Sequence, residues 1–199
     1  MKESYLTKAF RKTAHERFPE REAMLNSAFK KRLGELRSEH AGTSRQRMRH
    51  LESQIMPGIA AYETLQTVMP KEEALRTVHG YVEERAYRLK KIFLRLMRIP
   101  GLYKKVPEIF AAQTPKFFGI SAGFEAKEIR TTGGVWRIDM TRCPYHDECV
   151  RCGCPELCHC FCDSDDITYD GLHPKLIWQR TMTLGRGDDC CDFCMKVVK

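Results

Sequence analysis

The sequence predicts an α+β fold, in which a helical N-terminal part is followed by a small antiparallel sheet with a cysteine-rich helix and loop insertion. Apolar residues recur with a period of about 3.6 in the first part of the chain and about 2 from residue 117. All ten cysteines lie between Cys143 and Cys194. The net charge is +12 for residues 1–142 and −4 for residues 143–199. We therefore assign 1–116 to a helical part and 117–199 to a cysteine-rich α+β part of one compact domain.

Composition limits the class of protein. A chain of 199 residues, 42% of them hydrophobic, is long enough to bury a core. It has no run of about 18 apolar residues and no apolar signal segment near Met1, so we expect a cytoplasmic protein without a membrane partner. Lys and Arg are interleaved with Glu, and the sequence contains no nucleic-acid-binding motif. We therefore expect these charged residues to lie on solvated helix faces, and we expect no nucleic-acid partner. A homo-oligomer formed through the helical part is an open expectation.

The first part is expected to form helices that are interrupted at prolines. Residues 3–39 are predicted to be helical with a break near Pro19. Pro57 lies inside the apolar stripe of the next helix and should kink or break it. A shorter helix is expected over 102–113, before Pro115. The histidines on these charged segments are expected to face solvent: His15, His40, His50 and His79.

The second part is expected to form two antiparallel hairpins around a cysteine-rich segment. Turn glycines at 133–134 and at 185–187 should join the strands of each hairpin. The cysteine-rich segment covers 145–168 and should contain a short helix near Pro155. The predicted strands are 124–131, 135–142, 176–184 and 190–198.

Thiols, carboxylates and hydroxyl groups gather in three segments of the last third. Cys143-Pro144-Tyr145 ends a predicted strand. Glu156-Leu157-Cys158 leads to Cys162-Asp163 and Asp165. Arg180 and Thr183 precede Gly187-Asp188 and Cys191-Asp192-Phe193. In the order and spacing of these segments, the sequence resembles the L-2-amino-thiazoline-4-carboxylic acid hydrolase family, most specifically over residues 143–193.

This resemblance implies a hydrolase that opens the ring of a 2-amino-thiazoline-4-carboxylate or a similar cyclic amidine acid. The implied reaction is the hydrolysis of a non-peptide C–N bond, and its product is a carbamoyl-cysteine on a route to cysteine. The resemblance implies a small-molecule substrate and no required cofactor. Water must add to a carbon between nitrogen and sulfur, while a base takes its proton and an acid protonates the leaving atom. Alternatively, a thiolate attacks first and water resolves the covalent intermediate.

Spacing alone leaves the role of each residue open. Asp163, Asp165 or Asp166 is the candidate base, provided that burial raises its pKa. A candidate thiol nucleophile needs a positive neighbour or a helix N-terminus. A guanidinium suits the substrate carboxylate, and a hydroxyl suits the developing charge. The candidate catalytic residues are therefore Cys143, Cys162, Asp163, Asp165, Cys191 and Thr183, and the candidate substrate-binding residues are Arg180 and Tyr145.

Each of these residues also has a plain structural interpretation. A cysteine in a small core is most often a buried apolar residue, and an aspartate often caps a helix or holds a turn. Four cysteines and an aspartate at family positions together favour a site. We therefore expect four cysteines to converge beside the sheet, with the six others further out. The converging set is Cys143, Cys158, Cys162 and Cys191.

The six further cysteines suggest an alternative function. Cys149-x-x-Cys152 and Cys191-x-x-Cys194 are paired thiols at a spacing that suits zinc or an iron–sulfur cluster. In this alternative, Cys149, Cys152, Cys191 and Cys194 hold the metal, and the chain is a regulatory or interaction module without hydrolase activity. A thiol-rich protein from a reducing cell accounts for the same surplus without a metal.

Overall fold

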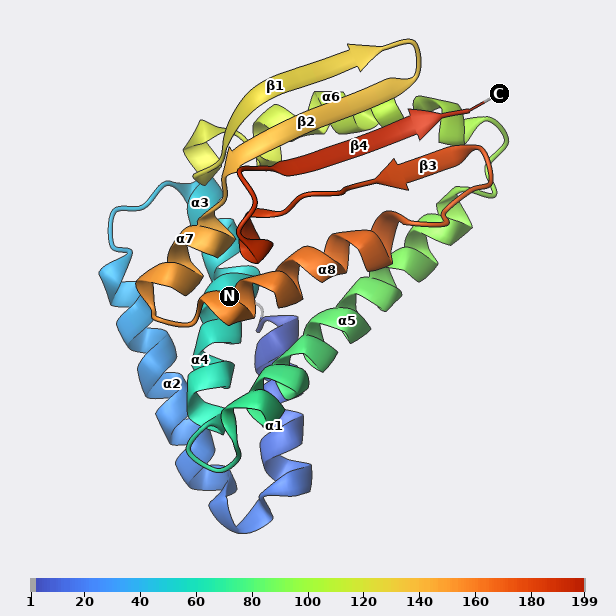
Figure 1. Cartoon of the computed structure of the whole chain (residues 1–199). Coiled ribbons are helices and arrows are strands. Elements are labelled where there is room, and N and C mark those ends of the chain that lie inside the picture. The colour runs from blue at the N-terminus through green and yellow to red at the C-terminus, as the bar shows by residue number, and fades with distance from the viewer. Residues whose placement is uncertain (1–2, 199) are drawn as a thin grey trace.

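The computed structural model describes residues 3–198, apart from the side chains of residues 128–131. It confirms the predicted class: a helical N-terminal part precedes a four-stranded antiparallel sheet (Figure 1). The helices are α1 (Tyr5–Arg17), α2 (Glu22–Glu39), α3 (Arg45–His50), α4 (Met56–Leu65), α5 (Lys71–Leu96), α6 (Val106–Phe117), α7 (Pro144–Arg151) and α8 (Cys158–Tyr169). The strands are β1 (Glu125–Thr132), β2 (Val135–Arg142), β3 (Leu176–Gln179) and β4 (Cys191–Val197).

The first hydrophobic core lies between α1, α2 and α4, which pack side by side in the lower half of Figure 1. Phe10 and Phe29 stack in it, with ring centroids 4.3 Å apart. The irregularity expected at Pro57 is present. Because proline has no N–H for the ladder, the chain passes from α3 to α4 through a π-helical turn, Leu51–Ile55.

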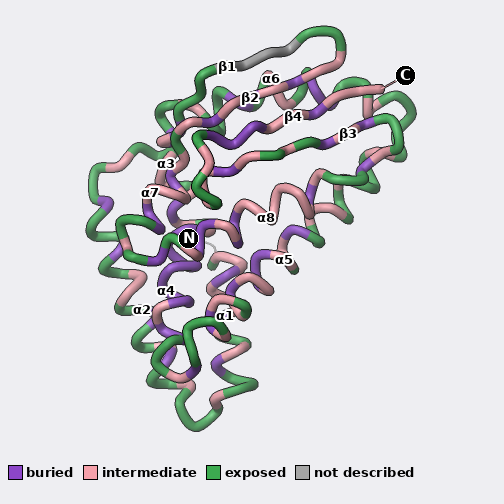
Figure 2. Tube along the Cα trace, viewed as in Figure 1, coloured by how far each residue is buried: buried purple, intermediate pink, exposed green. Residues whose placement is uncertain are grey.

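The cysteine-rich segment is more helical than predicted and belongs to this same core. Instead of one short helix near Pro155, it forms α7, a 3-10 turn and α8. Phe161 of α8 lies directly over Gly58 of α4, where an added Cβ would sit 2.6 Å from its ring. The Tyr62 hydroxyl donates to Glu156 at 2.6 Å. The helical core therefore draws on residues from both sides of position 116 (Figure 2).

The sheet has the strand order β1-β2-β4-β3, with every neighbouring pair antiparallel. The predicted hairpin of the last two strands is confirmed, but the third strand ends at Gln179 rather than at 184. The Asp192 carboxylate accepts hydrogen bonds from the N–H groups of Thr181 and Met182 at 2.7 and 2.6 Å. These bonds take the place of backbone hydrogen bonds between β3 and β4, so the residues after Gln179 form a loop.

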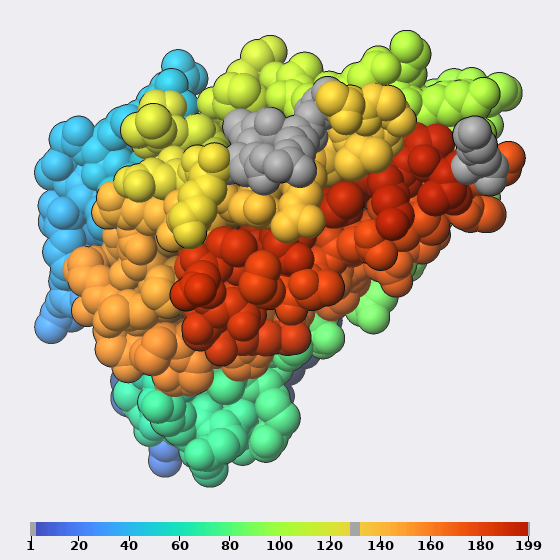
Figure 3. Space-filling model, turned by 45° about the horizontal axis from the view of Figure 1, so that its top comes forward, coloured from blue at the N-terminus to red at the C-terminus, as the bar shows by residue number. Residues whose placement is uncertain are grey.

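A second hydrophobic core covers the inner face of the sheet, against α6. Trp136 of β2 and Trp178 of β3 both face this core. The helix predicted over 102–113 instead runs to Phe117 and contains Pro115 near its end. Figure 3 shows the strands and the loop before β4 gathered on one face of the molecule. Within residues 3–198, none of the helices has the length and apolar character needed to span a bilayer.

Candidate active site

A cavity of about 540 Å³ lies between the inner face of the sheet and helices α5, α6 and α8. Segments far apart in the sequence meet there, because β2, β4 and α8 converge at one end of the sheet. Six of the eight candidate residues line it: Cys143, Tyr145, Cys162, Asp165, Arg180 and Cys191.

Three thiols face the cavity from three different elements. Cys143 precedes α7, Cys162 lies on α8, and Cys191 begins β4 opposite Met140. Cys158, one turn before Cys162 on α8, interacts with it by a thiol hydrogen bond. The backbone closes over this pair at Gly185, where an added Cβ would lie 3.1 Å from both sulfurs. The predicted convergence of these four cysteines is therefore confirmed.

The cavity thiols are held in their protonated form. Burial raises the pKa of Cys143, and it raises the pKa of Cys191 to about 11, although the Leu184 N–H and Arg180 oppose this. The hydrogen bond to Cys158 and burial both raise the pKa of Cys162. Cys158 is flanked by two thiol donors, Cys149 and Cys162, and these hydrogen bonds lower its pKa. Negative charge in this cluster is thus favoured on Cys158, behind the cavity wall.

Asp165 is a carboxyl group whose pKa burial raises to about 7. It lies deep in the protein, although the cavity leaves 38% of its side-chain surface exposed. Arg180 and Arg85 lower this pKa, and Asp166 raises it further. Asp165 therefore exchanges its proton near neutral pH, which suits a general base.

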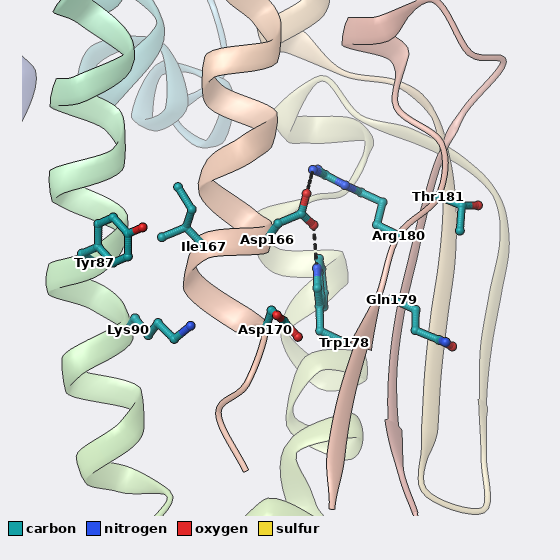
Figure 4. Close-up of a pocket in the computed structure, with 9 residues that line it drawn as sticks. All are labelled: Tyr87, Lys90, Asp166, Ile167, Asp170, Trp178, Gln179, Arg180 and Thr181. Atoms are coloured by element: carbon teal, nitrogen blue, oxygen red, sulfur yellow. Dashed lines mark hydrogen bonds and ion pairs between the residues drawn. The ribbon is translucent and has the colours of Figure 1, made fainter. Parts of the chain in front are cut away.

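Arg180 has a buried guanidinium, with 2% of its side chain exposed. Its Nη2 donates to Asp166, which also accepts the Trp178 indole N–H at 2.7 Å (Figure 4). Its Nη1 lies 3.7 Å from Asp165 and has no hydrogen-bond partner among residues 3–198. Burial opposes the charge, but Asp165 and Asp166 together raise the pKa of Arg180. One arm is therefore fixed by Asp166, and the other lies beside Asp165 without a hydrogen bond to any residue that the structure describes.

A chain of hydrogen bonds lines the cavity near Asp165. Arg85 Nη1 donates to Gln54 Oε1 at 3.0 Å, and Gln54 Nε2 donates to the Tyr145 hydroxyl at 3.0 Å. Because His50 Nε2 donates to the Phe117 carbonyl at 2.8 Å, its Nδ1 accepts from Tyr145, at 3.2 Å. Burial lowers the pKa of His50 and keeps the ring neutral. The network orients the Tyr145 hydroxyl and Arg85 beside the cavity.

The family model for L-2-amino-thiazoline-4-carboxylic acid hydrolase matches residues 48–195, which include every residue that lines the cavity. The chain belongs to this family. The family is named for a hydrolase, and the membership that the three cysteine-bearing segments indicated is confirmed. No curated protein matches the chain significantly in a sequence search.

Two candidate catalytic residues of this family member lie outside the cavity. Asp163 faces away from it and pairs with His79 Nε2 at 3.3 Å and Arg186 Nη2 at 3.2 Å. On a helix, positions 163 and 165 lie on different faces, so only Asp165 shares the face of Cys162. Thr183 is buried in the loop, and its hydroxyl has no partner in the described part of the chain. Its N–H donates to Asp188 at 2.7 Å, which indicates a role in shaping the loop.

The four cysteines of the alternative metal site are not brought together. Cys191 and Cys194 are three residues apart on β4, so their side chains point to opposite faces of the sheet. Cys149 contacts Cys154 and Cys158 in the helical core, not Cys191. It therefore lies closer to the converging set than predicted. Within residues 3–198, no group of three or more His, Cys, Asp or Glu side chains is arranged to hold a metal ion.

The sequence reasoning missed three residues of the hydrogen-bond chain that lines the cavity: His50, Gln54 and Arg85. His50 and His40 were expected to face solvent, but His50 lines the cavity and His40 is buried against Glu148 at 3.1 Å. His50 and Gln54 are four residues apart and therefore lie on the same helical face. That spacing was available in the sequence, but nothing in it placed Arg85 of α5 opposite them.

Proposed function

We propose that this protein hydrolyses the ring of a 2-amino-thiazoline-4-carboxylate or a closely similar cyclic amidine acid, giving a carbamoyl-cysteine type of product. The observation that carries the proposal is that the Asp165 carboxyl group lies 3.7 Å from Arg180 Nη1, which has no hydrogen-bond partner among residues 3–198, in one cavity. A carboxyl group that titrates near neutrality and a guanidinium with hydrogen-bonding capacity left supply the two functions that this substrate needs. Family membership supports the same reaction class.

Arg180 binds the substrate carboxylate through Nη1. A buried guanidinium is a strong partner for a carboxylate, because the charged hydrogen bond forms away from bulk water. Asp166 holds the other arm, so little side-chain entropy is lost on binding. Arg85, which lowers the pKa of Asp165 from the α5 side, adds a second positive charge to this end of the cavity.

Asp165 in its ionised form takes a proton from water, which adds to the ring carbon between nitrogen and sulfur. The oxygen of this water becomes the carbonyl oxygen of the product. A base with a pKa near the working pH combines a useful ionised fraction with good proton affinity. Because burial raises the pKa of Asp165 to about 7, its ionised fraction increases through neutral pH.

The proton that Asp165 takes from water passes to the leaving ring atom, and the cavity thiols donate hydrogen bonds beside it. Burial keeps Cys143 and Cys191 protonated at neutral pH, so they act as weak donors rather than as standing thiolates. This scheme uses side chains of the chain alone. We therefore expect turnover to survive dialysis against a chelator, and a loss of turnover that added metal restores would contradict the scheme.

The test is hydrolysis of 2-amino-thiazoline-4-carboxylate by the purified chain, with Cys143→Ser, Cys162→Ser and Cys191→Ser variants beside it. Mass spectrometry of the product in H₂¹⁸O should show one labelled carbonyl oxygen. Thiol and amine assays identify which ring bond broke. We expect each variant to keep measurable turnover, because water is the nucleophile. Abolished turnover in a folded variant, with a substrate adduct on that cysteine in the wild type, would replace water attack with covalent catalysis. No turnover by the wild type would overturn the proposed function.

A further inference from the structure

The cavity is larger and more aromatic than a small thiazoline acid requires. Its volume of about 540 Å³ falls in the range of about 300–1,000 Å³ that is typical of pockets for drug-sized ligands. A single five-membered ring with an amino group and a carboxylate fills only part of such a space. Most of the lining is aromatic or aliphatic, so the unfilled part is an apolar surface.

The lining has a charged region and a contiguous aromatic region. Asp165 and Arg180 mark the polar end, with the cavity thiols beside them. One helical turn after Asp165, Tyr169 begins the apolar arm. Its ring packs against Trp178, Phe93 and Phe110, with centroids 5.0, 5.8 and 5.2 Å away.

The apolar arm reaches the molecular surface at α6. Ile109 lines the cavity and is 45% exposed, next to Phe110 in the chain. Phe117 and Phe118, about two turns further along, also line the cavity and remain exposed. The arm thus leads from a buried polar end to an open apolar edge.

We infer that the substrate of this protein carries a bulky apolar group on the side of the ring away from its carboxylate. This inference rests on the proposed function and specifies its substrate class: an amphipathic 2-amino-thiazoline-4-carboxylate whose exocyclic nitrogen bears an aryl or alkyl group. The carboxylate binds Arg180, the ring lies beside Asp165, and the apolar group lies against Tyr169 and Phe110. The chemistry is unchanged: water adds, one ring bond breaks, and the leaving atom takes a proton.

The test compares 2-amino-thiazoline-4-carboxylate with its N-benzyl derivative, by steady-state kinetics and by calorimetric titration. Burying a benzyl group in an aromatic pocket should raise kcat/KM and lower Kd by about 10- to 100-fold. Equal or weaker binding of the N-benzyl compound overturns the inference. If neither compound is hydrolysed, the proposed function fails. A Kd about tenfold lower for the N-benzyl compound then still supports the assigned apolar arm.

Two matched variants test whether the preference for the N-benzyl compound arises in the apolar arm. Ile109→Glu places a charge in the apolar arm and should lower the preference for the N-benzyl compound by about tenfold. Ile92→Glu places the same charge on α5, at a residue that is 52% exposed and does not line the cavity, and should leave the preference unchanged. An equal effect of both variants, or no effect of Ile109→Glu, contradicts the placement of the apolar group.

Discussion

At the scale of single residues, Asp165 reduces the stability of the folded protein at neutral pH, and its proposed role as a base explains why. Its folded pKa of about 7 exceeds the value of about 3.9 expected in the unfolded chain. The folded state therefore holds this proton more tightly, and the contribution of Asp165 to stability falls as pH rises from about 4 to about 7. Groups that are tuned for chemistry often reduce stability in this way.

Asp165→Asn should consequently stabilise the protein at pH 8. The amide keeps the shape of the side chain and removes the buried charge. Because the cavity leaves 38% of the side chain exposed, we expect a rise in Tm of only about 2–4 °C, the shift that about 1 kcal/mol produces in a chain of this size. Calorimetric scans at pH 8 and pH 4 test this. The difference should shrink at pH 4, and a larger difference there would contradict the assigned pKa.

Arg180→Lys should weaken substrate binding more than it slows the chemical step. Lysine keeps the positive charge but cannot contact Asp166 and a substrate carboxylate with two fixed arms. If Arg180 binds the substrate equally in the ground and transition states, KM should rise about tenfold with little change in kcat. Initial rates over a range of substrate concentrations separate the effect on KM from the effect on kcat. A fall in kcat with unchanged KM would move Arg180 from binding into the chemical step.

At the scale of elements, the period of the apolar pattern predicted the helices and strands but not their interruptions. Hydrophobic periodicity reports which face of an element is buried, so the hairpins and long helices were recognisable. The end of β3 at Gln179 depends on the Asp192 carboxylate, which lies thirteen residues further along the chain. The cysteine-rich segment was underestimated as helix because its small thiol side chains give a weak apolar pattern. Its burial in the helical core follows from tertiary packing.

The loop before β4 should be intolerant of a side chain at Gly185. An added Cβ would lie 3.1 Å from the sulfurs of Cys158 and Cys162, so Gly185→Ala should destabilise the protein by about 1–3 kcal/mol. Gly80→Ala is the matched control, since α5 leaves open space there. It should stabilise by about 0.5–1 kcal/mol. Urea denaturation of both variants decides this, and equal stability of Gly185→Ala and wild type would mean that the thiols lie further from the loop.

At the scale of the whole molecule, the boundary at residue 116 separates two patterns in the sequence but does not separate the two packed cores. The core of the N-terminal helices is completed by Phe161, Leu157 and the buried thiols of α7 and α8. The candidate site was only partly predictable for the same reason. Family spacing identified Asp165, Arg180 and the thiols, whereas the choice between Asp163 and Asp165 depended on which face of α8 meets the sheet.

A fragment of residues 1–116 should therefore fail to fold cooperatively. It lacks Phe161 against Gly58 and the Glu156 acceptor of Tyr62. We expect a broad, non-cooperative loss of helix on heating the fragment and one cooperative transition for the full chain, as recorded by circular dichroism. A sharp transition in the fragment would show that the helical part is an independent domain.

The most direct test of the central claim compares Asp165→Asn with Asp163→Asn in hydrolysis of 2-amino-thiazoline-4-carboxylate. Both changes remove one carboxylate from α8, but only Asp165 lines the cavity. Loss of a general base typically reduces the rate by about 10²- to 10⁴-fold, so kcat/KM of Asp165→Asn should fall within that range. Asp163→Asn should stay within about threefold of the wild type, because it removes only partly exposed ion pairs. The reverse order, with Asp163→Asn inactive and Asp165→Asn active, would contradict the assignment of this cavity as the active site.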